Sequence, residues 1–313
     1  MIVSNQTQSP QPRPNEANTC AVIVTFHPDE RFVFLLHRVT SQFPAIFIID
    51  NGSSPAALEM LQREDSQPKI TLISNPTNRG IAAALNQGTR QARIANFDWA
   101  VTFDQDTEIY PGFLTKMLDV FDKSGGGNII IGSNYDESHK SRKITKHRLD
   151  DADLIAKERK TLITSGTLIP LDIFDRIGAF REDYFIDSVD HEFSLRAREH
   201  GYRLLMSRQP FMQHSIGNAV DRQRNFRLLL SYHHPPKRKY YISRNTVFTA
   251  IHYFSREPAW SIRQGWRMLS DLASIILLED DKARKLRAFL TGMAHGIKGK
   301  MGPIEETWPN GTY

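Results

Sequence analysis

The sequence is poor in cysteine and has no long apolar run. Its 313 residues include one cysteine, Cys20, which excludes a disulfide framework and a zinc site built from cysteines. So little cysteine fits a reducing compartment, and we expect a cytoplasmic protein. A run of about 18 apolar residues, the length that spans a bilayer, is absent. Residues 1–19 lack the features of a signal peptide and are expected to form a disordered leader.

Neither sign of charge dominates the whole chain, but its two ends differ. The net charge is +5, from 40 basic and 35 acidic residues. Residues 1–200 hold 22 Lys and Arg against 27 Asp and Glu, whereas residues 201–313 hold 18 against 8. The basic part could meet an anionic partner, such as nucleic acid, phosphate or a lipid surface, or it could form a solvated helical face.

Short apolar runs alternate with helical patterns up to about residue 110. The runs are rich in β-branched residues and end at turn signals, which predicts strands at residues 21–27, 45–50, 69–74 and 99–104. Amphipathic segments between them predict helices at residues 31–42, 56–65 and 78–95. Strands spaced by helices indicate an α/β fold, and continuous apolar strands indicate a mainly parallel sheet covered on both faces.

The pattern becomes less regular after residue 110. Further strands are predicted at residues 128–135, 161–170 and 202–207, and helices at residues 111–123, 171–178 and 189–201. Three more helical segments follow at residues 240–255, 261–278 and 281–300. Because no Pro- or Gly-rich linker divides the chain, we expect a leader (1–19), one α/β domain (20–220) and a helical C-terminal region (221–313).

Polar side chains follow several predicted strands, at the edge where open α/β sheets bind ligands. They are Thr25, Asp50, Asn51, residues 75–80, residues 104–106 and Ser165. Asp104 and Asp106 could grip a hard cation such as Mg²⁺, which prefers one or two carboxylates with phosphate oxygens, or they could form a solvated acidic turn. Arg79, before a Gly that begins a helix, could contact an anion or be a surface charge.

A second acidic group stands at the start of the predicted helix 189–201. Asp187, Asp190 and Glu192 could supply a general base, although acidic residues at a helix N-terminus are also explained by the helix dipole. His214 comes after the next strand. A single histidine is usually structural, but this one could complete a metal site with carboxylate and phosphate oxygens.

Taken in order, these motifs resemble glycosyltransferase family 2, the inverting GT-A enzymes that use nucleotide sugars. The resemblance covers residues 20–220 and rests on TFHPD, IIDNGSS, NPTNRGIAAALNQG, TFDQDTEIYPGFL, TSGTLI, YFIDSVDHEFSLRAREHGYRL and HSIG. Within the family, the chain resembles bacterial rhamnosyltransferases that use dTDP-L-rhamnose, through DNGSS, FDQDT, FIDSVDHEFSLRA, HSIG, YYISRN and AHGIKGKMG. The resemblance implies a GT-A fold with a helical appendage and a role in cell-surface polysaccharide synthesis, for example of O-antigen or cell wall.

The resemblance also implies roles for the candidate residues. Those expected to line the nucleotide pocket are Thr25, Asp50, Asn51, Arg79, Asp104 and Gln105. Mg²⁺ or Mn²⁺ would be held by Asp104, Asp106 and His214. It would neutralise charge on the diphosphate leaving group.

The resemblance places the general base at Asp190, with Glu192 as the second acid. The base would take the proton of the acceptor hydroxyl during a displacement that inverts the anomeric centre. The family has an acid just before the base, whereas this chain has Val189, so Asp187 stays an alternative base.

The expected partners are a nucleotide-sugar donor and a glycan or lipid-linked glycan acceptor. The basic helices could contact the inner face of the membrane through aromatic residues, or those residues could pack in a core or a homodimer; they are Tyr240, Tyr241, Phe248, Tyr253, Phe254, Trp260 and Trp266. A transferase for another dTDP- or UDP-sugar fits the same motifs.

Two other classes of function are disfavoured. A nucleic-acid-binding module could use the basic region, but two acidic clusters at the cleft would oppose its phosphates, so no nucleic-acid partner is expected. A nucleotidyltransferase would need a phosphate-gripping loop near the first strand, and TFHPDER is not such a loop.

Overall fold

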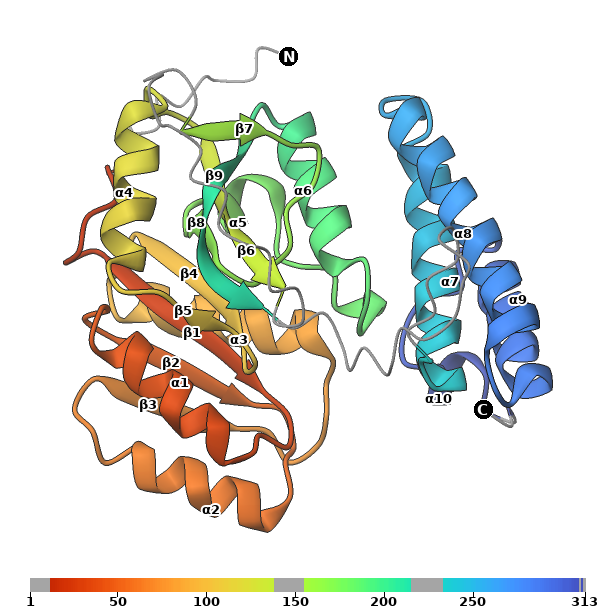
Figure 1. Cartoon of the computed structure of the whole chain (residues 1–313), viewed down its shortest axis with the longest axis horizontal. Helices are drawn as coiled ribbons and strands as arrows, with labels where there is room; N and C mark the ends of the chain where they lie inside the picture. Colours follow the sequence, from red (N-terminus) through yellow and green to blue (C-terminus); the bar gives the residue numbers. More distant parts are fainter. Residues whose placement is uncertain (1–11, 138–154, 215–232, 310, 312–313) are drawn as a thin grey trace, which may run out of the picture.

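The computed structural model describes residues 12–137, 155–214, 233–309 and 311. Figure 1 shows two parts: a central sheet between helices and, beside it, a bundle of helices from the C-terminal end of the chain. Within the described residues the sheet has nine strands, in the order β3-β2-β1-β4-β8-β6-β9-β5, with β7 paired to β9. This architecture confirms the predicted α/β class.

One half of the sheet is entirely parallel. It consists of β1 (Thr19–Thr25), β2 (Ile46–Asp50), β3 (Ile70–Ser74) and β4 (Trp99–Asp104). β1 pairs with β2 and β4, and β2 pairs with β3. β1 and β2 are buried along their whole length, which explains why they are continuous apolar runs. The register sets Thr25 beside Asp50 and Val24 beside Asp104, so three strand ends meet at one edge.

Three helices connect these strands: α1 (Glu30–Thr40), α2 (Pro55–Glu64) and α3 (Ile81–Ile94). α1 begins after Asp29, whose carboxylate accepts from the backbone N–H of Arg31. α2 begins after Ser54, with Pro55 in its first turn. α3 lies close on the sheet, because a Cβ at Gly88 would come within 2.4 Å of the Val22 side chain.

The other half of the sheet is mixed. β8 (Thr167–Pro170) runs antiparallel to β4 and to β6 (Ile129–Glu137). The twelve-residue β9 (Arg203–His214) runs parallel to β6 and pairs with the short strands β5 (Glu108–Ile109) and β7 (Ala156–Glu158). The helices of this half are α4 (Phe113–Lys123), α5 (Ile173–Ile177), the single turn η2 (Glu182–Tyr184) and α6 (Val189–Glu199).

The C-terminal helices are α7 (Pro236–His252), α8 (Pro258–Leu278), α9 (Lys282–Ile297) and the short α10 (Ile304–Thr307). α7 and α9 pack closely, because a Cβ at Gly292 or Gly296 would come within 2.4 Å of the carbonyl oxygen of Tyr240 or Arg244. A buried ion cluster also joins the helices. Glu279 pairs with Lys239 at 2.7 Å and with Lys285 at 3.0 Å.

Several expectations change in detail. Residues 161–166, predicted as the first part of a strand, precede β8 instead, and the strand predicted at 202–207 extends to His214. Residues 1–11 of the expected leader lie outside the described residues. Residues 12–18 contact the domain. For example, the Trp99 indole N–H donates to the Pro12 carbonyl at 2.8 Å. The expected boundary at residue 220 lies outside the described residues.

Most of the aromatic residues considered for membrane contact are buried. The buried ones are Tyr240, Tyr241, Tyr253 and Trp260. They pack in the core of the helical region and against α6, so a membrane role for these four is wrong. Phe254 and Trp266 are exposed. Among the described residues, no helix is both long and apolar enough to cross a membrane.

Candidate active site

The ends of β1 and β2 carry a buried hydrogen-bond network around Asp50. The Thr25 hydroxyl donates to Asp50 Oδ1 at 3.2 Å, and the backbone N–H of Ser53 donates to Asp50 Oδ2 at 3.0 Å. The Ser53 hydroxyl donates to Oδ1 as well. Both oxygens of this carboxylate are therefore held by the protein. The structure brings the expected nucleoside residues Thr25 and Asp50 together.

Asn51 organises the loop between β3 and α3. Its side-chain amide donates to Asn78 Oδ1 and to the Gly80 carbonyl, both at 3.1 Å, and its Oδ1 accepts from the backbone N–H of Arg79 at 3.0 Å. Gly80 needs to be glycine, because its φ is 85° and a Cβ would come within 2.5 Å of the Phe185 carbonyl oxygen. Arg79 itself is exposed. Asn51 is thus a fixed part of the framework that presents Arg79.

Gln105 is tied to the chain after β1. Its Oε1 accepts from the backbone N–H of Phe26 at 2.7 Å, and its Nε2 donates to the Phe26 carbonyl at 3.2 Å. Both ends of the amide are used in this clamp. It fixes the loop that begins with Asp104 relative to the end of β1.

Asp104, Asp106 and His214 form one cluster, in which a ligand atom from each lies within 4.8 Å of the others. Asp104 ends β4, and β5 pairs with the end of β9, so the sheet brings His214 beside the acidic loop. His214 Nε2 lies 3.8 Å from Asp104 Oδ2, and Nδ1 lies 3.5 Å from Asp106 Oδ1. Thr107 Oγ1 lies 3.1 Å from His214 Nδ1 and orients the ring.

The two carboxylates carry poorly compensated negative charge. Burial raises the pKa of Asp104 to about 6, and the charges of Asp106 and Asp190 add to the rise, whereas His214 and Arg238 oppose it. Burial likewise raises the pKa of Asp106, and His214 opposes the rise. Within the described part of the chain, His214 is the only ion-pair partner of either carboxylate.

This donor set fits a divalent cation. Two carboxylates and one imidazole suit Mg²⁺ or Mn²⁺ with further ligands from phosphate or water. The side chains of Asp104 and Asp106 keep 38% and 47% of their surface accessible, so an ion can reach them. A cation would also offset the burial that raises the pKa of both carboxylates, and the repulsion from Asp106 and Asp190 that adds to the rise at Asp104.

The three acidic residues near the start of α6 have different surroundings. Glu192 is buried, and it pairs with Arg196 through both oxygens at 3.0 and 2.8 Å. Asp187 is paired with Arg238 at 3.2 Å, and burial raises its pKa while Arg238 opposes the rise. Asp190 Oδ1 accepts from the backbone N–H of His191 at 2.8 Å. Its charge adds to the raised pKa of both Asp104 and Asp187, so Asp190 lies within electrostatic range of both carboxylates.

The loop that precedes α6 is held by α7. Phe185, Asp187 and Ser188 all have positive φ, a conformation that costs energy for residues other than glycine. The Asn245 amide donates to the carbonyl oxygens of Tyr184, Ile186 and Asp187 at 3.0, 2.7 and 2.9 Å. The neighbouring Arg244, which is fully buried, donates to the carbonyls of Asp183 and Tyr184, both at 3.1 Å.

Sequence reasoning assigned no role to Arg238, Arg244 or Asn245. The available signal was the motif YYISRN, which contains two of them and was used only as part of the resemblance. Arg238 pairs with the Asp187 carboxylate, and Arg244 and Asn245 donate to backbone carbonyls of the same loop, which lies 51 to 61 residues earlier. No local pattern predicts such contacts.

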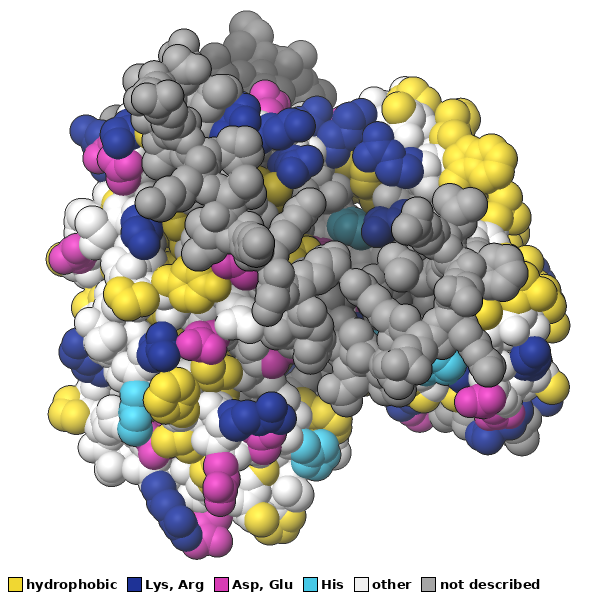
Figure 2. Space-filling view, in the orientation of Figure 1, with side chains coloured by type: hydrophobic (Ala, Val, Ile, Leu, Met, Phe, Trp, Pro, Cys, Tyr) yellow, Lys and Arg dark blue, Asp and Glu magenta, His cyan; other side chains and the backbone are white. Residues whose placement is uncertain are grey.

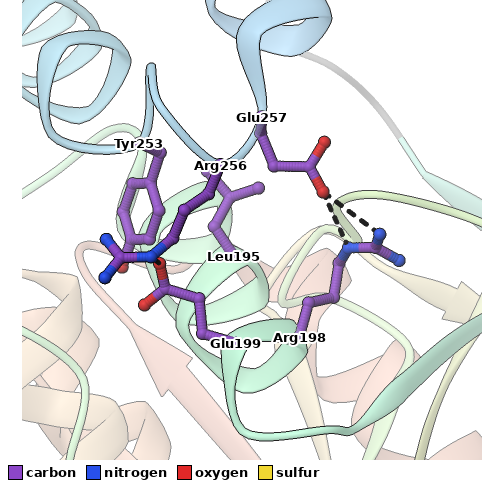
Figure 3. A pocket seen from close by; sticks show the side chains of 6 residues that line it. All are labelled: Leu195, Arg198, Glu199, Tyr253, Arg256 and Glu257. Atoms are coloured by element: carbon purple, nitrogen blue, oxygen red, sulfur yellow. Dashed lines mark hydrogen bonds and ion pairs between the residues drawn. The ribbon is translucent and has the colours of Figure 1, made fainter.

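A separate pocket of about 270 Å³ lies between α6 and the connection from α7 to α8 (Figure 3). Its charged side chains are paired with one another, Arg198 with Glu257 at 3.1 Å and Arg256 with Glu199 at 3.0 Å. None of the predicted site residues lines it. Because its charges are paired, we interpret it as a junction that fixes α6 against the helical region.

Comparison with known proteins now identifies the family. The sequence model described as Glycosyl transferase family 2 matches residues 20–186. The chain belongs to this family. Its activity is therefore that of a glycosyltransferase, and the predicted family is confirmed.

One known protein and two solved structures are also similar to this chain. The chain is 25% identical over 295 residues to "dTDP-rhamnosyl transferase RfbF" of Shigella flexneri, covering 91% of this chain and 97% of that protein. Residues 1–349 of S. aureus TarS match with a TM-score of 0.59 at 11% identity, covering 90% of this chain and 82% of that one. GalNAc-T7 with UDP, GalNAc and Mn²⁺ matches with a TM-score of 0.54 at 13% identity, covering 91% and 58%. These two structural likenesses show the GT-A fold.

Proposed function

We propose that this family 2 enzyme is an inverting, metal-dependent transferase that moves L-rhamnose from dTDP-L-rhamnose to a glycan or lipid-linked glycan. The observation that carries the proposal is the cluster of Asp104, Asp106 and His214, at the edge where the strands of the sheet end, with Asp190 within electrostatic range of Asp104. The domain at residues 20–220 would bind the donor. Its setting would be bacterial cell-surface polysaccharide synthesis in the cytoplasm.

Each residue of the cluster would have a distinct task. Asp104, Asp106 and His214 would hold Mg²⁺ or Mn²⁺, which supplies positive charge for the diphosphate when bound. Thr25 and Asp50 would face the nucleoside, with Asn51 fixing the loop that presents Arg79.

Asp190 would act as the general base. It would accept the proton of the acceptor hydroxyl while that oxygen bonds to the anomeric carbon and the bond from this carbon to the diphosphate breaks. Asp187 suits the role less, because both of its oxygens face Arg238, at 3.2 and 3.4 Å. Glu192 is held by Arg196, and we propose that it fixes the orientation of α6 instead.

The choice of rhamnose rests on the likeness to RfbF over nearly the full length of both chains. A transferase for another dTDP- or UDP-sugar is the second candidate, favoured by the TarS structure in complex with UDP-GlcNAc, which has a TM-score of 0.51 to this chain.

Thermal unfolding with nucleotide sugars tests the proposal. With Mn²⁺ present, dTDP-rhamnose should raise the melting temperature more than UDP-GlcNAc or a GDP-sugar does, because a ligand that binds only the folded state stabilises it. EDTA should remove that rise. A larger rise with a UDP-sugar would transfer the proposal to the second candidate, and no rise with any nucleotide sugar would contradict both.

A further inference from the structure

The exposed hydrophobic side chains of this protein are concentrated in its helical region. Of twelve large hydrophobic residues exposed in the described part of the chain, nine lie between residues 251 and 297. Figure 2 shows such side chains gathered along the outer edge of the C-terminal helices. Isolated exposed hydrophobic residues are ordinary, whereas a contiguous set marks a surface that binds something apolar.

Five of the nine lie on α8. They are Ile262, Trp266, Leu269, Ile276 and Leu277. The successive spacings of four, three, seven and one residues put them on one side of the helix. Met268 and Ile275, on the opposite side, are buried against α9. Trp266 is 69% exposed. We call these five residues the α8 stripe.

The exposed charges within α8 have one sign. Arg263 and Arg267 are exposed and, at 3.6 residues per turn, flank the stripe on one side. The only acidic residue within α8 is Asp271, which is partly buried, and burial raises its pKa. The exposed face of this 21-residue helix therefore combines apolar side chains with arginines and carries no exposed carboxylate.

We propose that the α8 stripe lies on a bilayer surface that carries anionic headgroups. The apolar side chains would enter the boundary between headgroups and acyl chains, and Arg263 and Arg267 would pair with lipid phosphates. A second copy of the chain fits less well, because an equivalent α8 face offers arginines and no exposed carboxylate to pair with them. This inference concerns a surface outside the candidate active site and does not depend on the sugar transferred.

Cosedimentation of the full chain with vesicles tests the inference. We expect binding to vesicles of phosphatidylcholine and phosphatidylglycerol, with weaker binding to phosphatidylcholine alone and at high salt. Replacing Trp266 and Leu269 by Gln should lower the affinity for vesicles at least about tenfold. Burying one large apolar side chain in the lipid contributes at least as much free energy as a tenfold change in affinity requires. The double variant R263Q/R267Q should lose mainly the dependence on phosphatidylglycerol.

Phe34→Gln and Ile94→Gln provide the matched control. Both residues are exposed hydrophobics of the α/β part, 59% and 65% accessible, and their replacement should leave vesicle binding unchanged. Absence of binding by the unaltered protein would overturn the inference, as would equal binding by the Trp266 and Leu269 variant. Sedimentation that shows a dimer dissociated by that same variant would assign the stripe to a second copy instead.

Discussion

The strand ends at the candidate active site form two polar groups that differ in how their charges are satisfied. At β1 and β2, Asp50 is buried and receives hydrogen bonds from Thr25 and Ser53. At β4 and β9, Asp104 and Asp106 are partly accessible, lie near Asp190, and have raised pKa values. The first group is complete within the protein, whereas the second has an excess of negative charge. This difference is the basis for our proposal that the second group holds a cation.

The largest expected effect comes from Asp190→Asn. If Asp190 is the general base that we propose, its loss should lower transfer about 10²–10⁴-fold. The release of dTDP from dTDP-rhamnose measures the rate, and Mn²⁺-dependent thermal protection by the donor should persist. Asp187→Asn and Glu192→Gln are the comparison variants. If Asp187→Asn lowers the rate of transfer by that factor and Asp190→Asn transfers at the rate of the unaltered protein, the base is Asp187.

Removing a carboxylate from the charged group comes next. Asp106→Asn should lower transfer about 10²-fold or more, because stabilisation of the leaving group by a metal is worth several kcal/mol. Asp50→Asn is the matched change in the satisfied group, where it should cost about 1–3 kcal/mol of stability through weakened hydrogen bonds. Thermal unfolding without metal compares them. A destabilisation by Asp106→Asn as large as that by Asp50→Asn would remove the contrast between the two groups.

Asn245→Ala tests whether α7 holds the loop before α6. Three carbonyl oxygens would lose their donor, and the loop that carries Asp187 and leads to Asp190 would relax. We expect a fall in kcat of about tenfold to 10²-fold, since small displacements of a reacting group cost that much. The affinity for the donor should change little. An equal fall in donor affinity would indicate general unfolding rather than positioning of the base.

The smallest expected effect is on stability as a function of pH. Because Asp104 has a pKa of about 6 in the folded protein, above the ordinary aspartate value of 3.8, the folded state holds this proton more tightly than the unfolded state. The contribution of Asp104 to stability should fall as pH rises from about 4 to 6 and stay constant above that. The free energy of unfolding of Asp104→Asn, measured in urea at several pH values, should not show this fall between about pH 4 and 6. An identical pH dependence in the variant would show that Asp104 does not cause it.

Sequence patterns predicted best the strands and helices whose local hydrophobic pattern is clear without knowledge of their neighbours in the fold. β1, β2 and β4 are continuous apolar runs, and α3 has an amphipathic period, so each was found within two or three residues. The two-residue β5 and the three-residue β7 were missed, because they exist only through pairing with β9. The extension of β9 to His214 depends on the same pairing.

For the candidate site, sequence order located the acidic residues but not their surroundings. Asp104, Asp106 and His214 come together as the motifs suggested. The pair of Glu192 with Arg196 is a local contact at a spacing of four residues within α6. By contrast, the clamp of Gln105 on Phe26 and the hold of Asn245 on the loop at 184–187 depend on contacts between side chains and distant backbone. Such contacts follow from the packed structure and leave no periodic trace in the sequence.

Uptake of Mn²⁺ tests the central claim, that the group at β4 and β9 needs a cation, most directly. Free Mn²⁺ can be followed by electron paramagnetic resonance during titration of the protein without nucleotide, so that the Asp50 variant is not affected by any loss of nucleoside binding. The account predicts that the unaltered protein takes up Mn²⁺, that D104N/D106N does not, and that Asp50→Asn does. Equal uptake by D104N/D106N and the unaltered protein, or no uptake by either, would contradict it.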